Sequence, residues 1–383
     1  MTYDVAVVGL GGIGSAIFAH CAARGAKTIG LEQFGAAHDL GSSHGKSRMI
    51  RKAYFEDPAY VPLLLRAYDL WRELEKESGE ELLTMTGLLM VGEESAPIVS
   101  GARHAASAHG LSLQVLTPRE IQRRYPTLQL LPNEIGVFEP DGGVLAPERA
   151  IAAYLRAAAR SGAEIRCESG VSGWEAKADA FEICLTSKAR LTTKSLILAQ
   201  GPWFSDALGV PLRVQRNVQA WFTPSTPAYA AGRFPPFLIE RANFPAPLYG
   251  FPDFGDGIKA AFHAHGTIGE VGQLDREINQ QRDIAPIIAA MEKWMPGATA
   301  TFRAAKPCPY TLTPDGHFVI DRHPEHKRVI LCGGFSGHGF KFAPVIGEIA
   351  ADLALDGGSR HEIDFLSPRR FSGSPFAEKS LTH

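Results

Sequence analysis

Four cationic side chains occur in segments that could present them to a bound anion. Arg48 and Arg51 lie in "HGKSRMIRK", Lys259 lies in the largely apolar "GDGIKAAFHAH", and Lys341 lies in the glycine-rich "HGFKF". Guanidinium and ammonium groups are the usual protein partners of a carboxylate. The ordinary alternatives are a solvated basic turn for the loop and, for the strand lysine, a side chain that reaches water from a sheet edge.

Cys308 lies between two prolines in "AAKPCPYTLTPDGHFVID". Prolines remove backbone donors and restrict the chain, so the thiol should be held in a stiff, mostly extended segment. A free cysteine is most often a small buried hydrophobe, and the residues alone leave that interpretation open beside a functional one.

A glycine-rich turn follows the first apolar strand. "YDVAVVG" is typical of a buried parallel strand, and "GLGGIG" then places Gly9, Gly11 and Gly14 in a G-x-G-x-x-G pattern before a helix. A second strand, "AKTIGLE", ends at Glu32. The glycines allow a tight turn, backbone approach to a pyrophosphate and close helix packing, and the acid can accept hydrogen bonds from ribose hydroxyls. The order and spacing predict a dinucleotide site. They leave NAD and FAD open, although a motif at the start of so long a chain favours FAD.

Composition excludes several classes of protein. The chain has 383 residues, of which 45% are hydrophobic, and a net charge of −2. We therefore expect two cores and neither a nucleic-acid nor a membrane partner. The five cysteines are scattered, which favours a reducing compartment, and we expect the cytoplasm. His263 and His265 form an H-x-H pair, but no nearby carboxylate or cysteine completes a ligand set, so we expect no metal.

The order of the expected elements gives an α/β fold with two domains. Dinucleotide-type strands and helices recur in separated parts of the chain, and a region rich in proline and aromatic residues intervenes. We expect a Rossmann-type domain assembled from discontinuous segments, with a second, mixed-β substrate domain. The expected segments are 1–80, 140–210 and 305–365 for the dinucleotide domain, 81–139 and 211–304 for the substrate domain, and 366–383 for a C-terminal tail.

Five motifs together resemble the monomeric sarcosine oxidase family, which includes N-methyltryptophan oxidase. They are "GLGGIGSA", "SSHGKSRMIRKAY", "YGFPDFGDGIKAAFH", "CPYTLTPDGHFVID" and "GGFSGHGFKFAP", in the family's order, and the resemblance runs from about residue 3 to residue 355. It implies that the dinucleotide domain binds FAD. It also implies that Cys308 attaches the flavin through a thioether to the 8-methyl position.

The resemblance further implies roles for the cations. Arg51 and Lys341 match residues that clamp a substrate carboxylate, and Arg48 matches a residue close to the flavin ring. Lys259 matches the residue that activates dioxygen above flavin N5, where a fixed positive charge would stabilise superoxide as it forms.

The remaining matches concern the pocket wall and the last turn. His263 matches a residue that helps to bind substrate, and Tyr249 and Tyr310 match pocket-lining tyrosines, although tyrosine is more often ordinary packing. The turn "GGFSGHGF", with Gly339, would bring backbone N–H groups and a helix N-terminus to the flavin N1–C2=O edge. The expected catalytic residues are Lys259, Arg48, His263 and Tyr310; the substrate-binding residues are Arg51, Lys341 and Tyr249; the cofactor-binding residues are Gly9, Gly11, Gly14, Glu32, Cys308 and Gly339.

The implied function is a monomeric flavin oxidase of a secondary amino acid, N-methyl or cyclic. Hydride transfer to FAD would give an imine, and dioxygen would become hydrogen peroxide. Four alternatives stay open: a flavin dehydrogenase with another electron acceptor, a non-covalent amino-acid oxidase of the same fold, a flavin-binding subunit without turnover, and a nicotinamide-dependent dehydrogenase.

Overall fold

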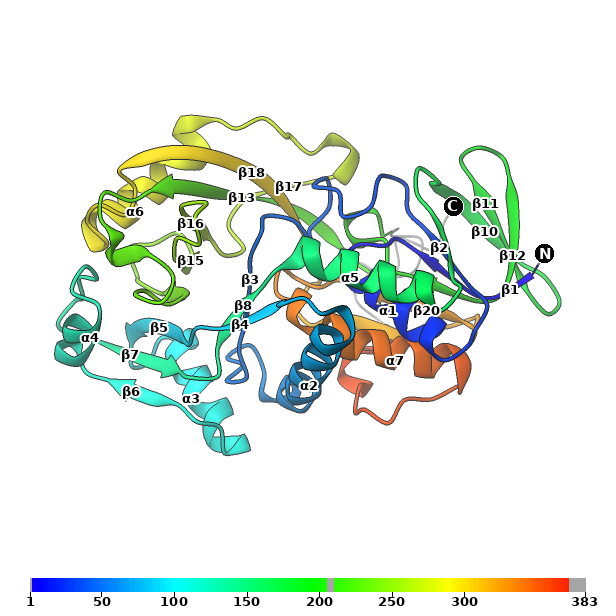
Figure 1. The fold of residues 1–383 in the computed structure, drawn as a ribbon, viewed down its shortest axis with the longest axis horizontal. Coiled ribbons are helices and arrows are strands. Elements are labelled where there is room, and N and C mark those ends of the chain that lie inside the picture. Colours follow the sequence, from blue (N-terminus) through cyan, green and yellow to red (C-terminus); the bar gives the residue numbers. More distant parts are fainter. Residues whose placement is uncertain (1, 205–209, 372–383) are drawn as a thin grey trace.

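The computed structural model describes residues 2–204 and 210–371. Two large sheets lie towards opposite ends of the molecule, with a three-stranded sheet between them (Figure 1). The sheet that contains β1 combines strands from the start, middle and end of the chain, blue, green and orange in Figure 1. The expected α/β class is therefore confirmed. Of the expected tail, residues 372–383 lie outside the described residues.

The first sheet has a parallel centre. Its order is β10-β11-β12-β1-β2-β9, and β20 and then β19 continue it from β12. β9, β2, β1, β12 and β20 are parallel neighbours. Most of these strands are short apolar runs because both faces of the sheet are covered. The strands are β1 (Thr2–Val8), β2 (Thr28–Leu31), β9 (Glu164–Arg166), β10 (Val171–Ala176), β11 (Phe181–Leu185), β12 (Arg190–Leu198), β19 (Val319–Arg322) and β20 (Val329–Gly333).

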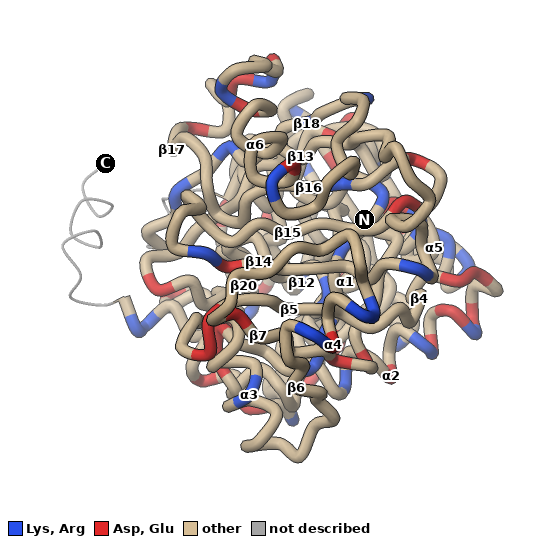
Figure 2. The backbone as a smooth tube through the Cα atoms, turned by 90° about the vertical axis from the view of Figure 1, so that its left-hand side faces the viewer, with Lys and Arg blue, Asp and Glu red and all other residues tan. Residues whose placement is uncertain are grey.

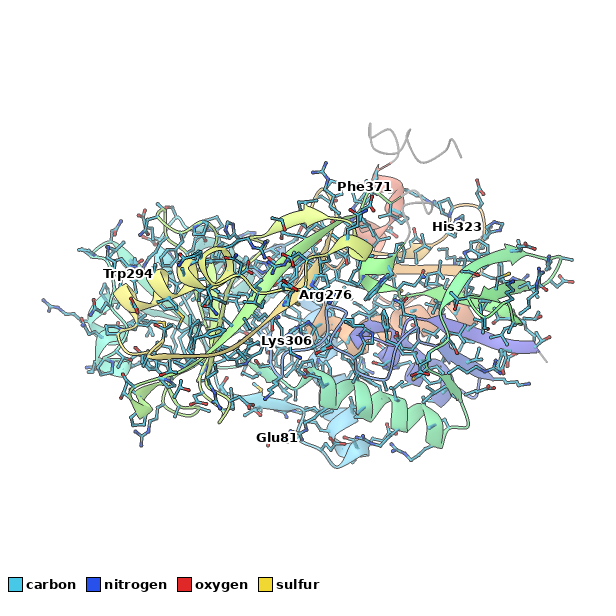
Figure 3. All side chains as sticks on the ribbon, turned by 90° about the horizontal axis from the view of Figure 1, so that it is seen from above. Glu81, Arg276, Trp294, Lys306, His323 and Phe371 are labelled. Atoms are coloured by element: carbon cyan, nitrogen blue, oxygen red, sulfur yellow. The ribbon has the colours of Figure 1, made fainter. Side chains whose placement is uncertain are left out.

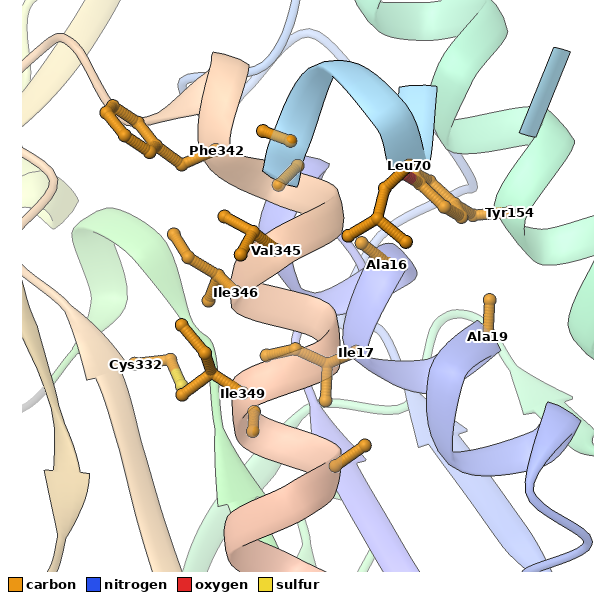
Figure 4. Close-up of a cluster of buried hydrophobic side chains, with 14 of the residues drawn as sticks. Ala16, Ile17, Ala19, Leu70, Tyr154, Cys332, Phe342, Val345, Ile346 and Ile349 are labelled. Atoms are coloured by element: carbon orange, nitrogen blue, oxygen red, sulfur yellow. The ribbon is translucent and has the colours of Figure 1, made fainter. Parts of the chain in front are cut away.

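The helices of this half pack closely on one another. α1 (Gly12–Ala23) contacts both α5 (Pro147–Arg160) and α7 (Ala343–Leu355), and α2 (Val61–Ser78) contacts α5 and α7. A Cβ at Gly347 would lie 3.0 Å from the Ala16 backbone, so the glycine lets α7 approach α1. Ile17 and Ile349 lie in the apolar core between these helices (Figure 4). This packing fixes the N-terminus of α1, where the glycine turn ends.

The second sheet is mixed, as expected. Its order is β17-β13-β16-β15-β14-β5-β7-β6, with β18 on the other side of β13. Within the part of the chain that the structure describes, β14 and β5 are its only parallel neighbours. Its strands are β5 (Leu88–Glu93), β6 (Gln114–Leu116), β7 (Glu134–Glu139), β13 (Arg213–Thr223), β14 (Phe237–Ile239), β15 (Leu248–Phe251), β16 (Ile258–Phe262), β17 (Thr267–Gly269) and β18 (Thr301–Leu312). Its helices are α3 (Pro97–His109), α4 (Pro118–Arg124) and α6 (Ala285–Trp294).

The small sheet joins the two halves. It has the order β3-β8-β4, with bounds β3 (Arg48–Ile50), β4 (Leu83–Met85) and β8 (Gly143–Leu145). The proposed domain segments stay a prediction. Strand β18 crosses the expected boundary at 304/305 while it pairs with β13 on both sides of that point.

Acidic and basic residues are interspersed along the backbone (Figure 2). Within residues 2–204 and 210–371, the helices are too short or too polar to cross a membrane.

Candidate active site

The glycine turn after β1 has the geometry that a dinucleotide requires. Gly9 has φ +88°, and a Cβ there would lie 2.6 Å from the Ala199 carbonyl oxygen. A Cβ at Gly14 would lie 1.8 Å from the Gly9 carbonyl oxygen, so α1 can pack on the turn only through glycine. Above Gly11, by contrast, the nearest atom to a Cβ is Ser43 Oγ at 3.9 Å. The backbone is therefore open to a ligand at the N-terminus of α1, where an anion is favoured.

Glu32 follows β2 in the wall of the same cavity. Its Oε2 accepts a hydrogen bond from the Leu10 N–H at 2.9 Å, and its Oε1 accepts from the Phe34 N–H at 3.1 Å. Burial raises the pKa of Glu32, but hydrogen bonds from His38, Leu10 and Phe34 outweigh burial, and the net pKa is lowered. The carboxylate is thus ionised at neutral pH, which suits ribose hydroxyls and repels a 2′-phosphate.

One cavity contains both the dinucleotide turn and most of the predicted cations. Gln219 also lines it, and the buried Oε1 of Gln219 has no hydrogen-bond partner among the described residues. A glycine cradle, a buried acid and an unused acceptor in one elongated cavity fit FAD. The lining residues that matter below are Gly9, Gly11, Glu32, Ser47, Arg48, Arg51, Phe55, Glu56, Tyr249, His263, Cys308, Tyr310, His338, Gly339, Phe340 and Lys341.

The loop between β2 and β3 is fixed against the second sheet. Lys306 on β18 pairs with Asp39, and Arg276 donates to the Leu40 carbonyl oxygen at 2.8 Å. Lys306 and Arg276 are labelled in Figure 3. Ser42 Oγ donates to the Pro309 carbonyl oxygen at 2.6 Å. The loop that leads into β3, where Arg48 begins the strand and Arg51 follows it, is therefore held beside the strand that carries Cys308.

Cys308 lies in an edge strand, which explains its proline neighbours. Among the described strands β18 pairs with β13 alone, and Cys308 is opposite Asn217. Prolines fit an edge strand where the backbone nitrogen faces away from the ladder, and the outward hydrogen bond of the Pro309 carbonyl agrees with this orientation. The predicted stiff, extended presentation of the thiol is confirmed.

Arg48 is the cation next to this thiol. Its Nη2 lies 3.7 Å from Cys308 Sγ and donates to the Ser42 carbonyl oxygen at 2.7 Å, and its Nη1 donates to the Ser47 carbonyl oxygen at 2.8 Å. Burial raises the pKa of Cys308, and the charges of Arg48 and Lys259 oppose that effect. The thiol thus has an electropositive neighbourhood although it is only 1% exposed.

Lys259 lies in β16, which is paired with β13 on one side and β15 on the other. It is 2% exposed, so the alternative in which it reaches water from a sheet edge is wrong. Its Nζ donates to the Gly45 and Ser47 carbonyl oxygens at 2.9 and 2.6 Å. Ser47 lines the cavity, whereas Lys259 does not. The Lys259 ammonium is therefore held at a fixed place behind Ser47, outside the cavity lining. Burial lowers its pKa well below the usual value, and Arg48 adds to this effect.

Arg51 already has an anionic partner, Glu56. Arg51 Nη2 lies 2.6 Å from both Glu56 carboxylate oxygens, and Arg51 Nη1 donates to the Ala53 carbonyl oxygen at 3.2 Å. The guanidinium carbon lies 4.5 Å from the centre of the Tyr54 ring and 4.1 Å from that of Phe55. Although burial opposes ionisation, the Arg51 charge holds the pKa of Glu56 at about 2. The cation expected to bind a substrate carboxylate is therefore already paired with an anion of the protein.

Lys341 lies in the single 3-10 turn Phe340–Phe342 that precedes α7. Its buried Nζ donates to the His338 carbonyl oxygen at 2.7 Å. Burial and then the Arg51 charge lower its pKa to about 7, against the opposing effect of Glu56. An ammonium group so poorly solvated gains strongly from a carboxylate neighbour.

His263, Tyr249 and Tyr310 are neighbours, as predicted for the pocket wall. The His263 ring centre lies 5.7 Å from that of Tyr310 and 6.3 Å from that of Tyr249. Burial lowers the pKa of His263 to about 4 and raises that of Tyr249 to about 12, so both are neutral at pH 7. A Cβ at Gly337 would lie 2.2 Å from the Tyr310 ring, so the last glycine turn packs directly on this wall.

Sequence reasoning missed two residues of this cavity. No role was predicted for Glu56, although an acid five residues after Arg51 in a short loop was a usable signal for a partner of that cation. His338 lies in the turn "GGFSGHGF". Its ring bonds with the Tyr54 hydroxyl and lies 3.1 Å from the Gly316 carbonyl oxygen, and its own carbonyl holds Lys341. Of the predicted site residues, all but Lys259 and Gly14 line the cavity. Within the described ranges, no three His, Cys, Asp or Glu side chains are grouped as metal ligands.

Comparison with known proteins identifies the cofactor. The sequence profile described as "FAD dependent oxidoreductase" matches residues 4–353. The chain belongs to this family of FAD-dependent oxidoreductases. The flavoprotein is 41% identical to a monomeric sarcosine oxidase from Streptomyces avermitilis over 98% of this chain and 99% of that protein. It is 31% identical to an N-methyl-L-tryptophan oxidase from Yersinia pestis, over 97% of this chain and 100% of that protein. The predicted family resemblance is confirmed.

A solved structure supports the fold of the flavoprotein. NikD, described as an unusual amino acid oxidase essential for nikkomycin biosynthesis, superposes with a TM-score of 0.86 over 96% of this chain and 97% of its own. At 23% identity this likeness shows the fold alone. The expected FAD-binding domain with a second, mixed-β domain agrees with it.

Proposed function

We propose that this flavoprotein oxidises a secondary amino acid, N-methyl or cyclic, with dioxygen as the electron acceptor. The observation that carries the proposal is the buried pair Lys341 and Arg51 in the cavity that also contains the dinucleotide turn. The names of the two relatives, a sarcosine oxidase and an N-methyl-L-tryptophan oxidase, support the same substrate class. A catalytically empty binding subunit would have no use for buried cations, which are costly to desolvate.

The test is a substrate panel under air with peroxide detection. N-methylglycine, N-methyl-L-tryptophan, L-proline and L-pipecolate are compared with glycine. We expect peroxide from at least one secondary amine and much less from glycine. Anaerobic loss of the yellow colour without peroxide under air would instead establish a dehydrogenase.

FAD, when bound, would supply the hydride acceptor for the C–H bond beside the amine nitrogen. The turn at Gly9 and Gly11 and the N-terminus of α1 would hold its pyrophosphate, and Glu32 would hold a ribose. We propose that Cys308 forms the covalent attachment and that the turn with Gly339 contacts the flavin. Support for the attachment comes from the rigid presentation of the thiol in the cavity wall, beside Arg48.

The substrate carboxylate would bind between Lys341 and Arg51. With Glu56 ionised and Lys341 protonated, these three groups carry a net charge of +1, which one carboxylate neutralises. His263 is uncharged, so it adds no anion beside the substrate amine. The cations near the amine therefore favour its neutral form, which is the form needed for hydride loss. Tyr249 and Tyr310 would shape the pocket around it. Lys259 and Arg48 would provide the fixed positive charge that dioxygen reduction requires.

Arg51→Ala is expected to raise the KM for carboxylate-bearing amines by about 100-fold or more, because it removes a ligand and leaves Glu56 buried and unpaired. Initial rates over a range of substrate concentrations measure the effect. The double variant Arg51→Ala/Glu56→Gln should recover part of the loss, since it removes the stranded charge. An unchanged KM in Arg51→Ala would exclude this residue from the carboxylate site.

Carboxylate affinity is expected to fall as pH rises above about 7. The pKa of Lys341 is lowered to about 7, so below that pH the ammonium is present, and above it the free enzyme loses the charge that binds the anion. A bound carboxylate raises this pKa again, so the dissociation constant should rise about tenfold per pH unit until the pKa of the complex is reached. Calorimetric titration with butanoate, which has no amine to titrate, measures this dependence. The Lys341→Met variant should show weak binding that is independent of pH in this range.

We also propose a cytoplasmic monomer. All five cysteines are free thiols in the structure, which suits a reducing compartment, and the Streptomyces relative is named as monomeric. Size-exclusion chromatography with light scattering tests the monomer, and a dimer mass would refute it.

A further inference from the structure

Trp71 in α2 is fully buried and contacts Lys341 and Phe340, two residues that line the cavity. Its Nε1–H donates to the Lys341 carbonyl oxygen at 2.9 Å. The Nζ of the same lysine donates to the His338 carbonyl oxygen at 2.7 Å. The two bonds therefore restrain Lys341 at both ends, one at its backbone and one at its ammonium group.

The Trp71 indole also reaches the dinucleotide turn through one intermediate ring. It stacks on Phe340, with ring centres 5.9 Å apart and an interplanar angle of 25°. Phe340 lines the cavity and covers Gly12, the first residue of α1, where a Cβ would lie 2.6 Å from the Phe340 ring. A single side chain thus contacts both the lysine and the residue that packs on the cofactor turn.

We propose that Trp71 is a positioning residue that fixes Lys341 relative to the cofactor turn. The proposal rests on the proposed role of Lys341 as a carboxylate ligand. The segment before Lys341 contains Gly337 and Gly339, which give the chain little rigidity of its own. A directional hydrogen bond from a large, immobile side chain supplies the restraint that the glycines lack.

The test is the Trp71→Phe variant, which keeps an aromatic ring against Phe340 but removes the N–H donor. We expect the holoenzyme to bind butanoate about tenfold more weakly by calorimetry, and the KM for the amine substrate to rise by a similar factor. Butanoate is the probe because it has the chain of N-methylglycine with carbon in place of nitrogen. The flavin content and kcat should change by less than about twofold, because neither depends directly on the indole N–H.

Tyr154→Phe is the matched control. Its ring centre lies 6.0 Å from that of Trp71, and its buried hydroxyl has no hydrogen-bond partner among the described residues. The variant therefore perturbs the same neighbourhood without removing a hydrogen bond, and we expect unchanged butanoate affinity.

Three outcomes separate the possibilities. Wild-type butanoate affinity in Trp71→Phe, or equal weakening in Trp71→Phe and Tyr154→Phe, overturns the positioning role. Wild-type affinity in Lys341→Met would instead refute the carboxylate site on which the inference rests. Should Trp71→Phe not fold, Trp71→Met removes the same donor with a flexible apolar side chain, and the same criteria apply.

Discussion

Lys259→Met is expected to slow the reaction of the reduced enzyme with dioxygen by about 100-fold or more, while reduction by the amine changes little. Dioxygen gains negative charge in its first reduction step, and a fixed cation stabilises that charge without reorganisation. We propose this role for Lys259, because the Gly45 and Ser47 carbonyls hold its side-chain nitrogen in place behind the cavity wall. Methionine has a similar shape and keeps contact with the Phe251 ring, so the variant chiefly removes charge.

The two half-reactions are measured separately by stopped-flow absorbance, first with substrate under anaerobic conditions and then with dioxygen. Lys46→Met is the matched control. Lys46 lies between the two residues whose carbonyls bind Lys259, but it is 62% exposed and pairs with Asp256 at the surface. It should leave both rates unchanged. Equal slowing of both half-reactions in Lys259→Met would show that the lysine only supports the 45–47 loop.

Cys308→Ser is expected to abolish acid-stable flavin completely. A hydroxyl cannot replace the thiol as the nucleophile under these conditions, because its pKa lies far above that of a cysteine. The other contacts proposed for FAD, at Gly9, Gly11 and Glu32, are untouched. Serine is also small enough for the buried position, so the protein should fold and bind FAD reversibly.

The measurement is the flavin that remains with protein after acid precipitation, together with intact mass spectrometry. Cys167→Ser is the control, because Cys167 is a partly buried free thiol that lies outside the cavity lining. That variant should retain the full covalent mass. Acid-stable flavin in Cys308→Ser would transfer the attachment to another residue.

Local sequence predicted the cofactor turn well because its requirements are local. Gly9 turns the chain with φ +88°, and Gly14 packs on the Gly9 carbonyl oxygen, so these two requirements arise within a few residues. The close approach of the Ala199 carbonyl oxygen to Gly9 is a tertiary contact. The stiff, extended backbone at Cys308 was predictable for a similar reason, since two prolines fix the chain around it.

The charge state of the substrate end was not predictable in the same way. The acid five residues after Arg51 marks Glu56 as a candidate partner, but whether the guanidinium binds both of its oxygens depends on how the loop after β3 folds back on itself. The boundary expected at 304/305 shows the same limit. The pattern of residues could not show that β18 continues through it, because strand length depends on the partner β13.

The sequence by itself determined the chemistry that is available: a dinucleotide turn, a rigidly held thiol and four cations. The tertiary structure alone decided which charges meet. The Lys259 ammonium is bound by carbonyls 214 and 212 residues away in the chain. The physical reason is that a buried ammonium must find partners wherever the packing supplies them, and a linear pattern does not contain that information.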